Sequence, residues 1–141
     1  MLMSIHPLLT GSLLAHLDAM GHSDAVVIAD AHFPAARLAD RVLTFPGLPT
    51  PDLLGAVRTV VPLDDAPGLD LMRSADGTRL AVQDELIAAG ASSERDVRFL
   101  GRHEFYAEAA SAYLIVRTGE TRTYGNVILR KGVVAQEAGS R

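Results

Sequence analysis

Polar side chains that could do chemistry gather in two short segments that flank apolar runs. The first segment, residues 21–34, contains His22 just before an apolar run and Asp30 just after it. Titratable and hydrogen-bonding groups beside buried strands are where an α/β domain usually carries its chemistry. Imidazole, carboxylate, phenol and amide groups in such places predict proton transfer on a polyhydroxylated ligand. The second segment is the triplet Tyr124, Gly125 and Asn126.

Each of these residues also has a purely structural interpretation. His22 follows the predicted end of a helix, where the helix dipole stabilises an imidazolium ion. Asp30 can accept backbone N–H bonds in a turn, and the triplet at 124–126 can simply be a turn that leads into a strand. His32 fits turn chemistry or packing, and Arg102 fits a charge beside a helix start. On the residues alone, the structural and the catalytic interpretations both stay open.

The composition describes one domain without covalent cross-links. The chain has 141 residues, no cysteine and a formal charge of −4, which excludes disulfides, thiolate metal sites and cysteine nucleophiles. Its 13 basic residues are scattered along the chain, which argues against nucleic-acid binding. We expect no signal peptide, because residues 1–9 lack a basic region and a long apolar region. We expect no membrane helix, because no apolar run approaches ~20 residues. We therefore expect a single cytoplasmic domain over residues 1–135 and a disordered polar tail over residues 136–141.

The pattern of apolar residues alternates along the chain between helix and strand. Three- and four-residue steps predict helices over residues 9–20, from Thr50 onward, over 79–90 and over 102–111. We expect Gly21 to end the first helix in a left-handed turn and the Thr50 hydroxyl to cap the second. Short apolar runs predict strands over residues 25–29, 41–45, 69–73, 97–100, 113–116 and 127–129.

This alternation predicts a three-layer α/β/α domain with a mostly parallel central sheet. In such a sheet, ligands bind where strand ends and loops converge. Asp30 follows the first strand whereas His22 precedes it, and the two ends of such a strand are ~17–20 Å apart. We therefore expect something other than this strand, such as a neighbouring subunit, to bring His22 and Asp30 together.

Three stretches of the sequence carry a family resemblance. They are residues 20–35, residues 118–120 and residues 124–132. In their order and spacing they closely resemble the fucose mutarotase and ribose pyranase family, and the match extends over residues 5–133. The ribose pyranase branch typically differs at four positions, and this chain resembles the fucose branch at each of them: His32, Phe33, Arg102 and Gly125.

The resemblance implies an isomerase that interconverts the α and β anomers of L-fucose by acid–base opening and closure of the ring. His22 matches the family's proton donor, and histidine suits this role because both its protonation states are accessible near neutral pH. No cofactor and no metal are implied. The resemblance further implies a homo-oligomeric ring, commonly a decamer, with sites near subunit contacts. The family's sugar-binding positions match Asp30, Arg102, Tyr124, Gly125 and Asn126.

Several alternatives stay open at this point. The reaction can instead interconvert pyranose and furanose forms of D-ribose, or the protein can be a non-catalytic sugar-binding accessory of a transport system. His103 stands where fucose-branch members often have a bulky apolar residue, so His103 competes with Arg102 for the sugar. The second proton-transfer group is a residue or a water, and Tyr124 is a weak base because a phenol has a pKa of ~10. A metal site is a further alternative, although one strand separates its two ligand pairs: His22 with Asp24, and Asp30 with His32.

Overall fold

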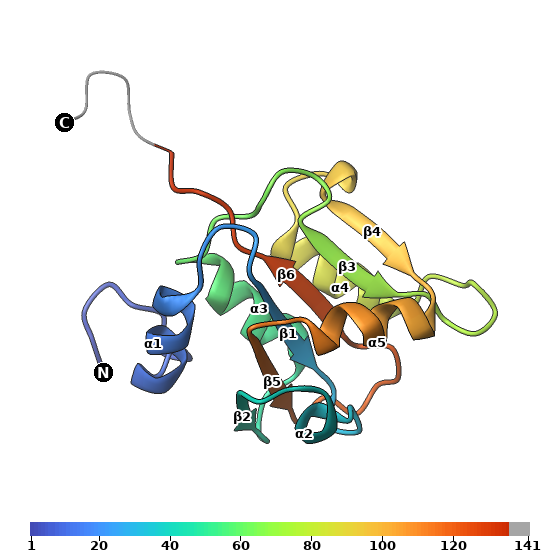
Figure 1. The fold of residues 1–141 in the computed structure, drawn as a ribbon, viewed down its shortest axis with the longest axis horizontal. Coiled ribbons are helices and arrows are strands. Elements are labelled where there is room, and N and C mark those ends of the chain that lie inside the picture. Colours follow the sequence, from blue (N-terminus) through green and yellow to red (C-terminus); the bar gives the residue numbers. More distant parts are fainter. Residues whose placement is uncertain (136–141) are drawn as a thin grey trace.

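The computed structural model describes residues 1–135. A six-stranded sheet lies at its centre, and helices pack on both faces of the sheet (Figure 1). The predicted tail over residues 136–141 lies outside the described residues. The strands are β1 (Ala25–Ala29), β2 (Val42–Phe45), β3 (Leu69–Met72), β4 (Val97–Leu100), β5 (Leu114–Thr118) and β6 (Val127–Arg130). The helices are α1 (Gly11–Ala19), α2 (Ala35–Leu38), α3 (Thr50–Arg58), α4 (Ala81–Gly90), the short 3-10 helix η1 (Glu94–Asp96) and α5 (Arg102–Ala110).

The direction of the strands decides which loops can meet. The strand order is β2-β5-β1-β6-β3-β4. β5 pairs in parallel with β1 and β2, and β3 pairs in parallel with β4. β6 runs antiparallel to both of its neighbours, β1 and β3. The start of β6 therefore lies at the same edge of the sheet as the ends of β1 and β3.

The apolar sides of the helices divide between the two faces of the sheet. Leu53 of α3 and Leu86 of α4 are fully buried in one cluster with Val26, and α1 contributes to the same layer. Phe105 of α5 is fully buried in a second cluster with Val27, and α2 contributes to that layer. Successive residues of β1 thus face opposite layers, as the pleat of a strand requires. The predicted three-layer α/β/α architecture with a mostly parallel sheet is confirmed. Within the described residues, no helix is both long enough and apolar enough to cross a membrane.

The starts of two helices show how local and distant groups compete for the same side chains. α1 begins after Thr10, whose hydroxyl accepts the backbone N–H of Leu13 at 3.3 Å, an ordinary N-cap. The capping role predicted for Thr50 is wrong. The N-cap residue of α3 is Pro49, and Thr50 Oγ1 instead donates to Glu120 Oε1 at 3.4 Å. The Thr50 hydroxyl, which the local sequence predicts to cap the helix, therefore donates its hydrogen bond to a buried carboxylate 70 residues away.

The connection between α1 and β1 also differs from expectation. Gly21 does not carry the left-handed turn: Met20 ends α1 in an extended conformation, and Ser23 has the positive φ, at 69°. The helix α2 was not predicted, because four residues are too few to show a helical period.

Candidate active site

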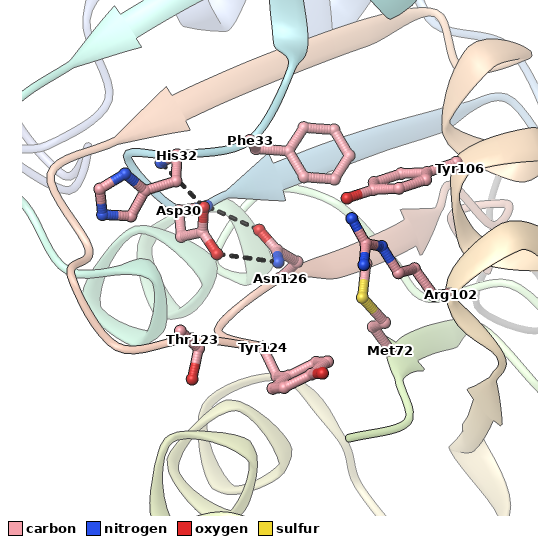
Figure 2. A pocket seen from close by; sticks show the side chains of 9 residues that line it. All are labelled: Asp30, His32, Phe33, Met72, Arg102, Tyr106, Thr123, Tyr124 and Asn126. Atoms are coloured by element: carbon pink, nitrogen blue, oxygen red, sulfur yellow. Dashed lines mark hydrogen bonds between the residues drawn. The ribbon is translucent and has the colours of Figure 1, made fainter. Parts of the chain in front are cut away.

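A cavity of about 190 Å³ opens at the edge of the sheet where β1, β3 and β4 end and β6 begins (Figure 2). Asp30 directly follows β1, and Arg102 begins α5 two residues after the end of β4. Tyr124 and Asn126 precede β6, whose reversed direction brings them to this edge. Ligands of α/β sheets bind at this kind of edge. The cavity is smaller than the ~300–1,000 Å³ typical of sites for drug-sized molecules, so it has room only for a small molecule.

Asp30 and Asn126 form the polar floor of the cavity and hold each other in place. Asn126 Oδ1 accepts the backbone N–H of Asp30 at 2.7 Å, and Asn126 Nδ2 donates to Asp30 Oδ2 at 3.0 Å. Asp30 Oδ1 also accepts the backbone N–H of His32 at 3.0 Å. Because each carboxylate oxygen has two acceptor positions, Asp30 keeps one on each oxygen for the hydroxyls of a ligand.

Arg102 and Tyr106 reach the cavity from successive turns of α5. The guanidinium carbon of Arg102 lies 5.6 Å from the centre of the Tyr106 ring, which is within the range of a cation–π contact. Figure 2 shows the Arg102 guanidinium and the Tyr106 hydroxyl pointing toward the Asp30–Asn126 pair. His103, the competing candidate, is exposed to solvent and lies outside the lining of the cavity. The geometry therefore places Arg102, rather than His103, where a ligand would sit.

Tyr124 lines the cavity in a strained backbone conformation. Its φ is 62°, a value that non-glycine residues seldom adopt and that often accompanies functional loops. The next residue, Gly125, is buried behind the loop: a Cβ atom there would lie 3.0 Å from Glu120 Cγ and 3.1 Å from a methyl carbon of Val82. Gly125 therefore gives the loop room to pack, while the side chain of Tyr124 faces the cavity.

An apolar wall completes the cavity on the side away from the carboxylate. It consists of Phe33, Met72 and the ring of Tyr106. The rings of Phe33 and Tyr106 meet edge to face at 5.6 Å, a favourable aromatic geometry. Phe33 was predicted only as one of the residues that carry the family resemblance, and Met72, Tyr106 and Thr123 were not predicted as site residues. The apolar spacing around Met72 and Tyr106 indicates only a buried face. The one available signal is that Met72 is the last residue of its strand, as Ala29 is the last residue of the strand before Asp30.

His22 lies at the opposite edge of the sheet from the cavity. It precedes β1, and the five residues of β1 separate it from Asp30 by about 17 Å of strand. Its side chain is 61% exposed, and Nε2 lies 3.1 Å from Asp64 Oδ1. The structure thus brings together four of the sugar-binding residues suggested by the sequence, Asp30, Arg102, Tyr124 and Asn126, and leaves His22 apart from them.

Asp64 keeps a negative charge beside the His22 ring. The hydroxyl of Ser23, which donates to Asp64 Oδ2 at 2.8 Å, is the largest cause of the lowered pKa of Asp64. The backbone N–H of Asp65 and the His22 ring lower this pKa further. Because an ionised carboxylate can only accept hydrogen bonds, His22 Nε2 carries a proton. Nδ1 is then the ring nitrogen left to exchange a proton with another molecule.

The residues of the alternative metal site, His22 with Asp24 and Asp30 with His32, lie at opposite edges of the sheet. His22 lies beside Asp64, whereas the Asp30 carboxylate is bound to Asn126 and to the His32 backbone. Over residues 1–135, no three His, Asp or Glu side chains are grouped closely enough to share a metal ion.

The chain is similar in sequence and in fold to several known proteins. The model of the RbsD / FucU transport protein family matches residues 3–134. The structure of fucose mutarotase from Streptococcus pneumoniae in complex with L-fucose is 33% identical, with a TM-score of 0.87 over 95% of this chain and 100% of that chain. FucU from Bifidobacterium longum is 32% identical, with a TM-score of 0.82 over 93% of this chain and 99% of that chain. Bacillus subtilis RbsD complexed with D-ribose is 28% identical, with a TM-score of 0.74 over 94% of this chain and 100% of that chain.

These likenesses confirm the resemblance carried by residues 20–35, 118–120 and 124–132, which all fall within the matched region. Both the sequence match and the shared fold extend over nearly the whole chain. The chain belongs to the RbsD / FucU transport protein family.

Proposed function

We propose that this protein is an L-fucose mutarotase that binds the sugar at Asp30 and opens and recloses its ring. The observation that carries the proposal is the Asp30–Asn126 pair, because its free acceptor positions face a cavity that also receives the Arg102 guanidinium. A carboxylate that accepts and a guanidinium that donates suit neighbouring sugar hydroxyls. The fold shared with the fucose mutarotase of S. pneumoniae, in complex with L-fucose, supports this assignment.

The reaction needs two proton movements and no change of oxidation state. The anomeric hydroxyl loses its proton, the bond between C1 and the ring oxygen breaks, and the ring oxygen gains a proton. The product is an open aldehyde, which rotates about its C1–C2 bond and closes again on its other face by the reverse steps. Each proton transfer by a positioned acid or base contributes typically ~10²–10⁴-fold. Asp30, Arg102, Tyr124 and Asn126 hold the sugar, and histidine supplies the proton.

We assign the proton donor to His22 of a second copy of the chain. Within one chain, β1 keeps His22 and the cavity at opposite edges of the sheet. His22 is largely exposed and is held by Asp64, so its free Nδ1 is available to a neighbouring molecule. When one edge of a subunit meets the opposite edge of the next, the contacts form a ring if the rotation between neighbouring subunits closes. A decameric ring of this kind would give every cavity one His22.

The apolar wall favours L-fucose over D-ribose. L-fucose carries a methyl group on its ring, whereas the pyranose ring of D-ribose has no such substituent. Phe33 and Met72 are each about 95% buried and offer apolar surface opposite the Asp30 carboxylate. Burying a methyl group on such a surface is favourable by ~0.8 kcal/mol. The likeness to the fucose mutarotase, with a TM-score of 0.87, also exceeds the likeness to RbsD, with 0.74.

Magnetisation-exchange NMR on the anomeric protons of L-fucose tests this function, with D-ribose in a parallel sample. We expect the protein to accelerate α to β exchange of L-fucose, the His22→Ala variant to lose the acceleration, and Asp30→Ala to weaken it. Binding of L-fucose without acceleration would instead indicate a sugar-binding accessory. Equal or faster exchange between the pyranose and furanose forms of D-ribose would place the protein with the ribose pyranases.

A further inference from the structure

We propose that Glu120 is a positioning residue: it fixes the two loops that carry the sugar-binding side chains, without touching the sugar. The inference rests on the proposed function, because it concerns how that cavity holds its ligand. Glu120 belongs to residues 118–120, one of the three stretches that carry the family resemblance. None of these three residues lines the cavity, so their role is not direct contact with a ligand there. Glu120 lies between the end of β5 and the loop that holds Tyr124.

The carboxylate of Glu120 binds the loop that leads to Tyr124. The Glu120 side chain is 3% exposed. Its Oε2 accepts from the backbone N–H of Arg122 at 3.1 Å and from Arg122 Nε at 2.9 Å. Arg122 Nη2 donates to the other oxygen, Oε1, at 3.0 Å. A two-pronged contact of this kind fixes orientation as well as distance. Glu120 thereby sets the course of the chain just before it turns through the strained Tyr124.

The same residue binds the loop that carries Asp30. The carbonyl oxygen of Glu120 accepts the backbone N–H of Ala31 at 2.8 Å, directly beside Asp30. Thr118 adds a second link, because its buried hydroxyl donates to the Ala29 carbonyl at 2.8 Å and accepts the backbone N–H of Glu120 at 3.1 Å. One residue thus connects both polar sides of the cavity.

Glu120 also ties these loops to the helix layer behind them. Its Oε1 accepts from both the backbone N–H and the hydroxyl of Thr50, at 3.3 and 3.4 Å, where α3 begins. Residues with positive φ persist when their surroundings over-determine them, and the packing of Gly125 against Glu120 Cγ gives Tyr124 such surroundings. Without the carboxylate, the loop would lose its anchor to Arg122 and its anchor to α3 together.

Arg122 offers a control, because its guanidinium also binds Glu85, with Nη2 shared between Glu85 Oε1 and Glu120 Oε1. Arg122 Nη1 donates to Glu85 Oε2 on α4 at 2.6 Å, and the Glu85 side chain is 50% exposed. An exposed pair of this kind contributes little to stability. The Glu85→Gln variant therefore removes the charge of a partner of Arg122 and leaves the carboxylate of Glu120 in place.

The test measures KM and kcat for L-fucose exchange together with the melting temperature. In Glu120→Gln we expect KM to rise at least tenfold, in Arg122→Lys three- to tenfold, and in Glu85→Gln less than twofold. Arg58→Ala serves as a stability control, because Arg58 binds the Gly90 and Val61 carbonyls at the far end of α3. It should lower the melting temperature and leave KM within twofold of wild type.

An unchanged KM in both Glu120→Gln and Arg122→Lys, with only a lower melting temperature, would overturn the proposal. If Glu120→Gln does not fold, Arg122→Lys decides alone, because it keeps the charge and loses the fork. A wild-type protein that does not accelerate exchange would count against the proposed function instead. In that case the position of the loop is measured by the backbone amide NMR signals of Asp30 and Ala31 in protein without sugar. These signals should shift in Arg122→Lys but not in Glu85→Gln. Unmoved signals would overturn the proposal.

Discussion

Asn126 binds both the backbone and the side chain of Asp30, so the carboxylate at the end of β1 is oriented by the residue that begins the path into β6. Each of the two residues is more than nine-tenths buried. The Asn126 side chain uses its amide oxygen as an acceptor and one amide N–H as a donor in its bonds to Asp30. From the sequence alone, these groups would be assigned to the sugar. We therefore expect Asn126 to act on a ligand largely through Asp30.

Replacing Asn126 by Ala should damage both stability and activity. The buried N–H and one oxygen of Asp30 would lose their partners, which costs about 1–3 kcal/mol of unfolding free energy. With the carboxylate free to rotate, we expect the acceleration of L-fucose exchange to fall at least ~10-fold, the effect of about 1.4 kcal/mol. Urea unfolding and exchange NMR on the same sample measure the two effects. An active variant with unchanged stability would refute the role of this pair.

Gly119 should tolerate no side chain, because the backbone at Pro46 passes directly beside it. A Cβ atom at this position would lie 1.9 Å from the Pro46 carbonyl oxygen. Gly119→Ala must displace one of the two backbones, and we expect a loss of about 1–3 kcal/mol in unfolding free energy. Gly55→Ala is the control: nothing lies within 4 Å of its Cβ, and alanine inside α3 should add ~0.5–1 kcal/mol. Equal effects at the two positions would contradict the geometry.

The stability that Glu120 contributes should be lost in acid. The hydrogen bond from the Arg122 side chain is the main cause that lowers the pKa of Glu120 from 4.5 to about 2. Between these values the unfolded chain binds more protons than the folded one, so this contribution is complete above pH 4.5 and disappears as the pH falls toward 2. Because Arg122 is 41% exposed, solvent weakens its ion pair with Glu120. We therefore expect the ionised Glu120 to contribute roughly 2 kcal/mol to the free energy of unfolding.

Urea unfolding at several pH values measures this loss by comparison with Glu120→Gln, whose amide does not titrate. The difference in unfolding free energy between wild type and variant should narrow as the pH falls below 4.5. A difference that stays constant through this range would show that Glu120 does not titrate as its contacts require.

Shortening the apolar wall should reduce the preference for a sugar that carries a methyl group. D-arabinose has the same arrangement of ring hydroxyls as L-fucose and lacks the methyl. In Met72→Ala we expect the ratio of kcat/KM for L-fucose to that for D-arabinose to fall about fourfold, since burying one methyl group is worth ~0.8 kcal/mol. Val57→Ala, on the opposite layer, should lower stability and leave the ratio unchanged. An unchanged ratio in Met72→Ala would exclude this wall as the methyl site.

The fold could be predicted largely because local patterns decide it, whereas the cavity depends on long-range pairing. Val26 to Ala29 form an apolar run that indicates a buried strand from sequence alone. Nothing local shows that Val127 begins a strand antiparallel to β1, and this direction is what places Asn126 beside Asp30. Tyr106 is a similar case: its spacing next to Phe105 indicates a core face, and the sequence does not show that its side chain lines the cavity.

The errors have the same physical origin. Thr50 has the chemistry of a helix cap, but the buried Glu120 carboxylate offers its hydroxyl and its N–H a distant acceptor. The separation of His22 from Asp30, in contrast, could be predicted from strand length alone, and the described chain has this separation.

A mixed-subunit experiment tests most directly whether the cavity of one chain works with His22 of another. The His22→Ala and Asp30→Ala chains are first assayed alone by exchange NMR with L-fucose, and then after co-expression and purification as mixed assemblies. Each variant alone should be inactive or strongly weakened. In a random mixture, about a quarter of the sites in a closed ring would combine an intact cavity with an intact His22 from its neighbour, so we predict recovery of about a quarter of wild-type activity. Mixed assemblies that stay as inactive as the separate variants would contradict the account.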